Sequence, residues 1–181
     1  IAKTKKPILL STGMSDYNEI KKAISAIKKI HSKIIIMQCT STYPCPPEKV
    51  GLNQIIEMKK KFKLETGYSD HTGEIYSGLA AVTLGAKVIE FHLTYSKKFF
   101  FGPDSTSSLD PVKAKYLISG IRYIDKLLKY ERKKTKKNFK KIRKIFNKGI
   151  FSKKNLEKNQ KLKMSDLSFL KPVIGIPASE Y

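Results

Sequence analysis

The sequence predicts an α/β fold made of four strand–helix units, the C-terminal half of a TIM-type (β/α)8 barrel. Short apolar segments alternate, over the first 130 residues, with longer segments whose apolar residues recur every three to four positions. This alternation indicates parallel strands joined by helices. Each short segment ends in a polar cluster, and no Gly-x-Gly-x-x-Gly motif follows any of them. Because all strands of a barrel deliver their following loops to one site, we favour the barrel over a doubly wound open sheet.

The first unit is a strand over residues 7–12 followed by an amphipathic helix. Ser15 is the expected N-cap, because a serine hydroxyl accepts hydrogen bonds from the first turn of a helix. Apolar side chains then recur at helical spacing: Ile20, Ile24, Ile27 and Ile30. They predict one helix face packed on the sheet.

The second unit is a strand over 33–38, with a helix that we expect to open at Pro46-Pro47, since proline is tolerated in a first helical turn. The third unit is a short strand over 64–68 and a helix over 74–85. Small residues in that helix allow close packing on a sheet.

The fourth unit is a strand over 87–92, a loop over 95–109 and a helix over 110–130, with Pro111 in its first turn. Residues 1–131 are therefore the expected half barrel. Because the chain opens on Ile1 and directly on a strand, we expect it to be a fragment whose other half precedes it.

The remaining residues differ in composition. Residues 132–148 form an expected basic linker, and 149–181 are too few for an independent core, so we expect a truncated small domain. The net charge is +22, but the run over 133–144 is mostly lysine and lacks the repeated arginine and aromatic interleaving of a base-reading surface. This composition favours a solvated linker over a polyanion-binding segment, and we do not expect a nucleic-acid partner.

Two further classes of partner or linkage are not expected. No apolar run is long enough to cross a bilayer, so no membrane partner is predicted. The two cysteines, Cys39 and Cys45, are expected to be reduced thiols of a cytosolic protein.

Two histidines stand where predicted strands end, His71 after 64–68 and His92 at the end of 87–92. Imidazoles bind Mn, Fe, Zn or Co, and two nitrogens alone leave coordination positions for water or substrate. The alternative is that each histidine is a hydrogen-bonded structural residue, and strand positions alone do not decide between the two. Glu90 would either orient a ligand or be a buried, paired acid.

Hydroxyl groups gather at the same predicted sheet edge, among them Ser41, Tyr43 and Ser69. Together with backbone N–H groups they are able to hold a phosphate or carboxylate, or they simply cap strand ends. Asp104 lies in a Gly-Pro-Asp turn, where it would grip sugar hydroxyls or act only as a turn residue.

Five segments together resemble the second half of the sialic acid synthases, a family that includes N-acetylneuraminate, legionaminate and pseudaminate synthases. The segments are 6–14 (KPILLSTGM), 38–44 (QCTSTYP), 67–72 (GYSDHT), 85–92 (GAKVIEFH) and 102–104 (GPD). Residues 149–181 resemble, more weakly, the start of the SAF (antifreeze-like) domain that follows the barrel in this family.

The resemblance implies a barrel enzyme that condenses phosphoenolpyruvate, N-acetylmannosamine or a related 2-acetamido aldose, and water. The products are a nine-carbon 2-keto sugar acid and phosphate. It also implies a divalent metal, Mn²⁺ with Mg²⁺ or Co²⁺ as alternatives, held by His71 and His92 as a Lewis acid.

The same resemblance assigns substrate contacts. Ser41 and Ser69 match positions that hold the phosphate of phosphoenolpyruvate, and Tyr43 and Asp104 match catalytic positions that contact the sugar or the intermediate. Lys171 stands where the family has an arginine that reaches across a domain-swapped homodimer to the partner's sugar.

The resemblance further implies a cytoplasmic enzyme whose general-base glutamate and phosphate-gripping lysines belong to the preceding half. The 181-residue chain alone is therefore expected to be inactive. Two other functions stay open from the residues: another metal-dependent barrel carbon–carbon lyase, and a basic nucleic-acid-binding protein.

Overall fold

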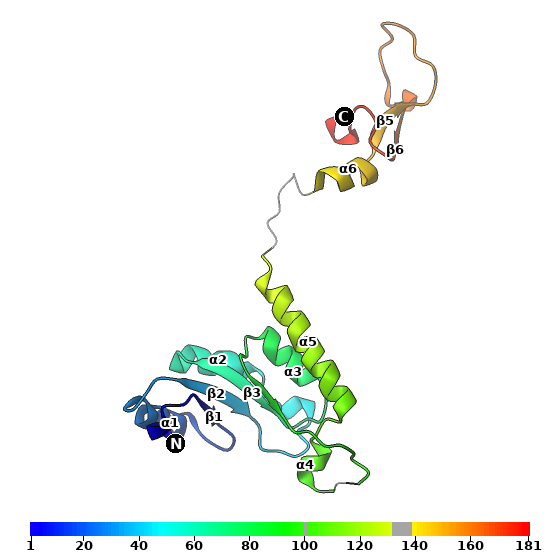
Figure 1. Cartoon of the computed structure of the whole chain (residues 1–181). Coiled ribbons are helices and arrows are strands. Elements are labelled where there is room, and N and C mark those ends of the chain that lie inside the picture. Colours follow the sequence, from blue (N-terminus) through cyan, green and yellow to red (C-terminus); the bar gives the residue numbers. More distant parts are fainter. Residues whose placement is uncertain (100, 132–138) are drawn as a thin grey trace. The chain divides into compact units, whose positions relative to one another are not determined.

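The computed structural model describes residues 1–99, 101–131 and 139–181, which fall into two compact units, Ile1–Tyr130 and Glu131–Tyr181 (Figure 1). The first unit holds a sheet of four parallel strands in the order of the chain. The strands are β1 (Ile8–Ser11), β2 (Ile34–Cys39), β3 (Glu65–Asp70) and β4 (Ile89–Phe91). The prediction of four consecutive parallel strands is confirmed.

Helices follow each strand of the first unit. They are α1 (Tyr17–Lys28), α2 (Asn53–Phe62), α3 (Tyr76–Thr83), α4 (Pro103–Thr106) and α5 (Pro111–Lys129), with short 3-10 helices η1 (Ala2–Thr4) and η2 (Pro47–Lys49). Helix α2 packs on β2 and β3, α3 packs on β3 and β4, and α5 lies alongside α3 (Figure 1). Asp110 caps α5, with Pro111 in its first turn as expected.

The start of α1 differs from the prediction. Its N-cap is Asp16 and not Ser15: the Asp16 carboxylate accepts hydrogen bonds from the N–H groups of Asn18 and Glu19. The Glu19 carboxylate in turn accepts from the Asp16 N–H at 3.0 Å. An acid and a glutamate three residues apart satisfy donors in both directions, which a cap at Ser15 does not. Ile30 lies beyond the end of α1 and is exposed.

The start of α2 also differs. Pro47 opens η2, and the α-helix begins only at Asn53. Gly51 stands between them with φ +68°, a left-handed conformation that ends the first turn, so no continuous helix runs from Pro46-Pro47. The predicted opening of α2 at these prolines was therefore wrong.

The core of the first unit lies between the helices and one face of the sheet. Beneath α1 it joins Ile20 and Ile24 to Met58, which is 1% exposed. Beneath α5 it joins Leu117 to Leu109. The first cluster packs against β1 and β2, and the second packs against β4.

The second unit consists of α6 (Lys140–Phe146), an antiparallel ribbon of β5 (Gly149–Ser152) and β6 (Leu167–Leu170), and the 3-10 helices η4 (Met164–Asp166) and η5 (Ala178–Glu180). Helix α6 lies inside the stretch expected to be a linker, whose residues 132–138 are outside the described residues. Asp166 is buried, and the side chain of Lys154 at 2.8 Å lowers the pKa of its carboxyl group, aided by the Lys163 N–H. Across the described residues, no helix is both long and apolar enough to span a bilayer.

Candidate active site

His71 lies directly after β3 and is almost fully buried, with 4% exposure. Its Nδ1 atom is 3.0 Å from the carbonyl oxygen of Thr40 and 4.0 Å from Sγ of Cys39. Its own carbonyl accepts a hydrogen bond from the Cys45 N–H at 2.8 Å. Since a carbonyl oxygen can only accept, Nδ1 carries the hydrogen, and the Nε2 lone pair of His71 is left to bind a ligand.

His92 lies directly after β4, and its side chain is 31% exposed. Its carbonyl accepts from the Leu109 N–H at 2.8 Å, which pairs the chain after α4 with the chain after β4. Its Nδ1 is 3.6 Å from Oδ1 of Asp104, a carboxylate that is 74% exposed. Asp104 therefore faces His92 from α4.

Three rings meet at this edge of the sheet. The centroids of His71 and His92 are 5.1 Å apart with an interplanar angle of 73°. The Tyr43 ring, from the loop after β2, lies 4.2 Å from the His71 centroid and 5.9 Å from the His92 centroid. Burial, the Cys39 thiol and the Asp104 carboxylate raise the pKa of Tyr43, which keeps its phenol a hydrogen-bond donor. The structure thus brings four of the sequence-selected residues together: Tyr43, His71, His92 and Asp104.

Ser69 and Ser41 occupy different environments. Ser69 is 2% exposed in β3, and its hydroxyl donates to the carboxylate of Glu90. Glu90 itself is exposed, so of the two alternatives for this residue the buried acid is wrong, and a role in orienting a ligand stays a prediction. Ser41 is exposed in the loop after β2, and a Cβ on Gly13 would meet its Oγ. Gly13 therefore allows the loop after β1 to approach Ser41 closely.

Lys171 belongs to the second unit. Its Nζ lies 5.7 Å from the centroid of the Phe146 ring, a cation–π contact. The substrate contact assigned to Lys171 by resemblance stays a prediction.

The two imidazoles fit a divalent cation. The Thr40 carbonyl orients His71 as carbonyls orient metal-binding histidines, and the His92 ring lies beside it. Among the described residues, no group of three or more His, Cys, Asp or Glu side chains is placed to hold a metal. Two protein nitrogens with water or substrate oxygens in the remaining positions is the donor set these residues offer.

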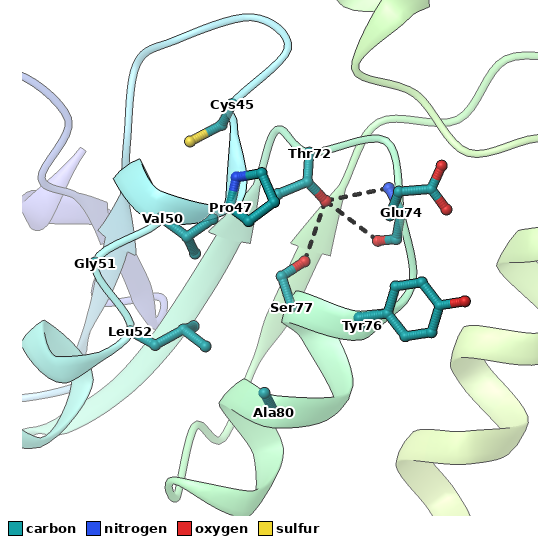
Figure 2. A pocket seen from close by; sticks show the side chains of 10 residues that line it. All are labelled: Cys45, Pro47, Val50, Gly51, Leu52, Thr72, Glu74, Tyr76, Ser77 and Ala80. Carbon is teal, nitrogen blue, oxygen red and sulfur yellow. Dashed lines mark hydrogen bonds between the residues drawn. The ribbon is translucent and has the colours of Figure 1, made fainter.

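A cavity of about 420 Å³ lies beside the β3 end, between the segment after β2 and α3 (Figure 2). Its lining residues are Cys45, Pro47, Val50, Gly51, Leu52, Thr72, Glu74, Tyr76, Ser77 and Ala80. Neither histidine lines it. The cavity is therefore separate from the three-ring cluster, although two of its lining residues adjoin the His71 main chain: the Cys45 N–H donates to the His71 carbonyl, and Thr72 follows His71 in the chain.

Sequence reasoning missed the backbone groups that set the site. The Thr40 carbonyl and the Cys45 N–H act on His71 through main-chain atoms, which every residue type provides. In the sequence Cys39 is only a thiol at a strand end, and its position next to the His71 ring depends on the pairing of β2 with β3. No pattern of residue types in the sequence predicts such main-chain contacts.

Comparison with known proteins gives a consistent family. The NeuB family model matches residues 1–133. The chain is 40% identical, over its whole length, to the N,N'-diacetyllegionaminic acid synthase of Campylobacter jejuni, and covers 55% of it. It is 37% identical over 128 residues, 70% of the chain, to the human N-acetylneuraminate-9-phosphate synthase, and covers 35% of it.

A solved structure agrees with this result. The N-acetylneuraminic acid synthetase of Leptospira borgpetersenii, in complex with citrate, aligns with a TM-score of 0.69 at 30% identity, covering 78% of this chain and 49% of that one. The four-stranded parallel sheet is therefore a curled half barrel of that type. The chain spans about half the length of the legionaminic acid synthase and the solved synthetase. Since the family match covers the whole first unit, including the three-ring cluster, the chain belongs to the NeuB family.

Proposed function

We propose that this chain supplies the second half of the active site of a sugar acid synthase. The reaction condenses phosphoenolpyruvate, water and a 2-acetamido aldose such as N-acetylmannosamine, and releases phosphate and a nine-carbon 2-keto sugar acid. One observation carries the proposal: Tyr43, His71 and His92 pack ring against ring at consecutive strand ends within the family match. The names of the legionaminic acid and N-acetylneuraminate-9-phosphate synthases support this reaction class.

In this proposal His71 and His92 hold a divalent cation, Mn²⁺, which supplies Lewis-acid polarisation of the sugar aldehyde. The neutral phenol of Tyr43 donates a hydrogen bond to an oxygen of the sugar or the intermediate. The Asp104 carboxylate accepts hydrogen bonds from sugar hydroxyls, for which its high exposure leaves it free.

Ser41 and Ser69 hold the phosphate of phosphoenolpyruvate in this proposal. A hydroxyl has a single hydrogen, and that of Ser69 is donated to Glu90. Ser69 must therefore release Glu90 when it donates to a phosphate oxygen. The exposed side chain of Glu90 is free to move away when this happens.

The test mixes this chain with a separately expressed first half of the Campylobacter jejuni relative, the part that the chain does not cover. Phosphate release from phosphoenolpyruvate is measured with N-acetylmannosamine and with diacetamido sugars. The same first half mixed with its natural second half is the positive control. Release in that control, and none with this chain and any of these sugars, overturns the proposal.

A second arm tests the cation on the chain by itself. Mn²⁺ binding is followed by the loss of its free-ion electron paramagnetic resonance signal. We expect His71→Ala and His92→Ala each to weaken binding by about tenfold or more, because each removes one of two protein ligands. His31→Ala is the matched control, since that histidine lies before β2, at the opposite end of the strand from Thr40.

A further inference from the structure

Asp70 is a buried carboxylate that the proposed reaction does not use. It is the last residue of β3, is 2% exposed, and directly precedes His71. Its Oδ1 accepts from the Tyr68 hydroxyl at 3.0 Å and from the Thr72 N–H at 2.8 Å. Its Oδ2 accepts from the Ser77 hydroxyl at 2.7 Å. Strand β3, the turn after it and helix α3 thus each give this carboxylate one donor.

The hydrogen bonds extend beyond Asp70. The Thr72 hydroxyl lies 3.1 Å from the Ser77 hydroxyl, accepts from the Glu74 N–H at 3.1 Å and is 3.3 Å from the Glu74 carbonyl (Figure 2). Thr72 is therefore held through both its backbone and its side chain. A buried charge is tolerated when its oxygens are fully hydrogen-bonded, and such a network is rigid.

This network encloses His71. The bond from the Thr72 N–H back to Asp70 closes a turn over the residue between them, and that residue is His71. On the other side, the Cys45 N–H holds the His71 carbonyl. The main chain of His71 is consequently fixed before, at and after the residue. With the main chain held in this position, the His71 ring reaches the Thr40 carbonyl.

We propose that Asp70 is a positioning residue for the cation site. Its carboxylate fixes the backbone of His71 so that Nδ1 donates to Thr40 and Nε2 stays the ligand nitrogen. The cation part of this inference rests on the proposed function, whereas the effect on the His71 ring does not. A buried acid that only stabilised the fold would leave the state of the ring unchanged when replaced.

The experiment is a ¹⁵N NMR measurement on the full chain labelled at histidine, which contains only three histidines. We expect His71 to show the tautomer with the hydrogen on Nδ1. Asp70→Ala is expected to move His71 to a mixture of tautomers while the signals of His31 and His92 keep their positions. The Mn²⁺ dissociation constant rises about tenfold in the same variant, as for other residues that orient ligands.

The matched control is Tyr68→Phe, which removes another donor to Asp70 but keeps the bond to the Thr72 N–H. It is expected to leave the His71 signals in place. If Asp70→Ala leaves them in place too, or if Tyr68→Phe moves them equally, the inference is overturned.

Two further variants keep the result decisive. If Asp70→Ala fails to fold by circular dichroism, Asp70→Asn is read instead. Its single oxygen cannot serve all three donors, so we expect a partial shift of the His71 tautomer, and no shift refutes the positioning role. If His71→Ala leaves Mn²⁺ affinity unchanged, the proposed cation site fails, while the tautomer measurement still decides the role of Asp70.

Discussion

The ends of β3 and β4 each present one histidine, yet they hold it very differently. His71 is buried, and backbone groups of Thr40 and Cys45 fix its ring and carbonyl. His92 also has its carbonyl bonded, to the Leu109 N–H, but its side chain is about one-third exposed and its Nδ1 lies 3.6 Å from the exposed carboxylate of Asp104. Two residues of one type at equivalent strand ends thus divide into an anchored and an adjustable member.

The cause lies in the sheet. Strand β3 pairs with β2 on one side and β4 on the other, and the Asp70 network ties its end to α3. Strand β4 has three residues and stands at the end of the strand order. In a site built on these two strand ends, the β3 end with His71 is fixed. The β4 end with His92 is the one that adapts to a ligand.

The largest expected effect is a difference between the two histidines in how much their substitution lowers the free energy of unfolding. His71→Ala removes a buried, hydrogen-bonded ring packed on Tyr43, and we expect it to lower the free energy of unfolding by about 3 kcal/mol. His92→Ala removes a partly exposed ring and should cost about 1 kcal/mol or less. Urea unfolding followed by circular dichroism measures both. Equal losses would contradict the division into anchored and adjustable ends.

A smaller loss of stability, on substitution of Gly73, tests how the segment after β3 is joined to the segment after β4. Gly73, two residues after His71, has φ +69°, and a Cβ there would lie 2.8 Å from the carbonyl oxygen of Thr106, in α4 before Leu109. Gly73→Ala is expected to cost about 2–3 kcal/mol, from backbone strain and from this contact.

The matched control is Gly85→Ala, which has φ +98° but nothing within 4 Å of the added Cβ. It should cost about 1 kcal/mol, from strain alone. Thermal unfolding of both variants checks this difference. If the two changes prove equally costly, the contact between Gly73 and Thr106 does not join the two ends.

The free energy of unfolding should depend on pH through Tyr68, a buried residue of β3. Burial, and then the charge of Asp70, raise the pKa of Tyr68 above its ordinary value. The contribution of the Tyr68 hydroxyl to the free energy of unfolding is therefore fully present below the unfolded pKa of about 10. Above that pH it declines by about 1.4 kcal/mol per pH unit.

Urea unfolding at pH 9, 10 and 11 measures this decline. Tyr68→Phe should remove that part of the decline, whereas Tyr76→Phe, at a position that is 73% exposed, should not. A decline that persists unchanged in Tyr68→Phe would assign it to other groups.

The smallest effect is expected at the β4 end. Asp104→Asn should change the free energy of unfolding by less than about 0.5 kcal/mol, because its partner is 3.6 Å away and the carboxylate is mostly exposed. The same variant should raise the KM for the sugar in the phosphate-release assay with kcat less affected. A large loss of stability would show that the β4 end is anchored after all.

Much of this fold follows from side-chain patterns. Apolar runs locate β1 to β4 within a few residues, and the polar ends after β3 and β4 locate His71 and His92 correctly. Strand pairing then brings these residues together, because parallel strands present their carboxyl ends at one edge. The placement of the candidate site was predictable for this reason.

The details that failed involve main-chain geometry or competing local choices. Asp16 outcompetes Ser15 as N-cap because Glu19, three residues later, completes a reciprocal pair of hydrogen bonds. The left-handed turn at Gly51 delays α2, and no apolar pattern records it. The anchoring of His71 also depends on backbone donors and acceptors, which carry no residue-type signal.

The strand order has a consequence for local opening. Strands β2 and β3 have a strand on each side, whereas the far side of the β4 segment is met only by the Leu93–Leu109 bridge among the described residues. Amide hydrogens in 65–70 should therefore exchange with deuterium slowly and those in 89–93 faster. Opening of β4 alone would then carry His92 away while His71 stays in place. A ligand that bridges both rings should slow exchange in 89–93 far more than in 65–70, which makes this short strand a direct reporter of occupancy.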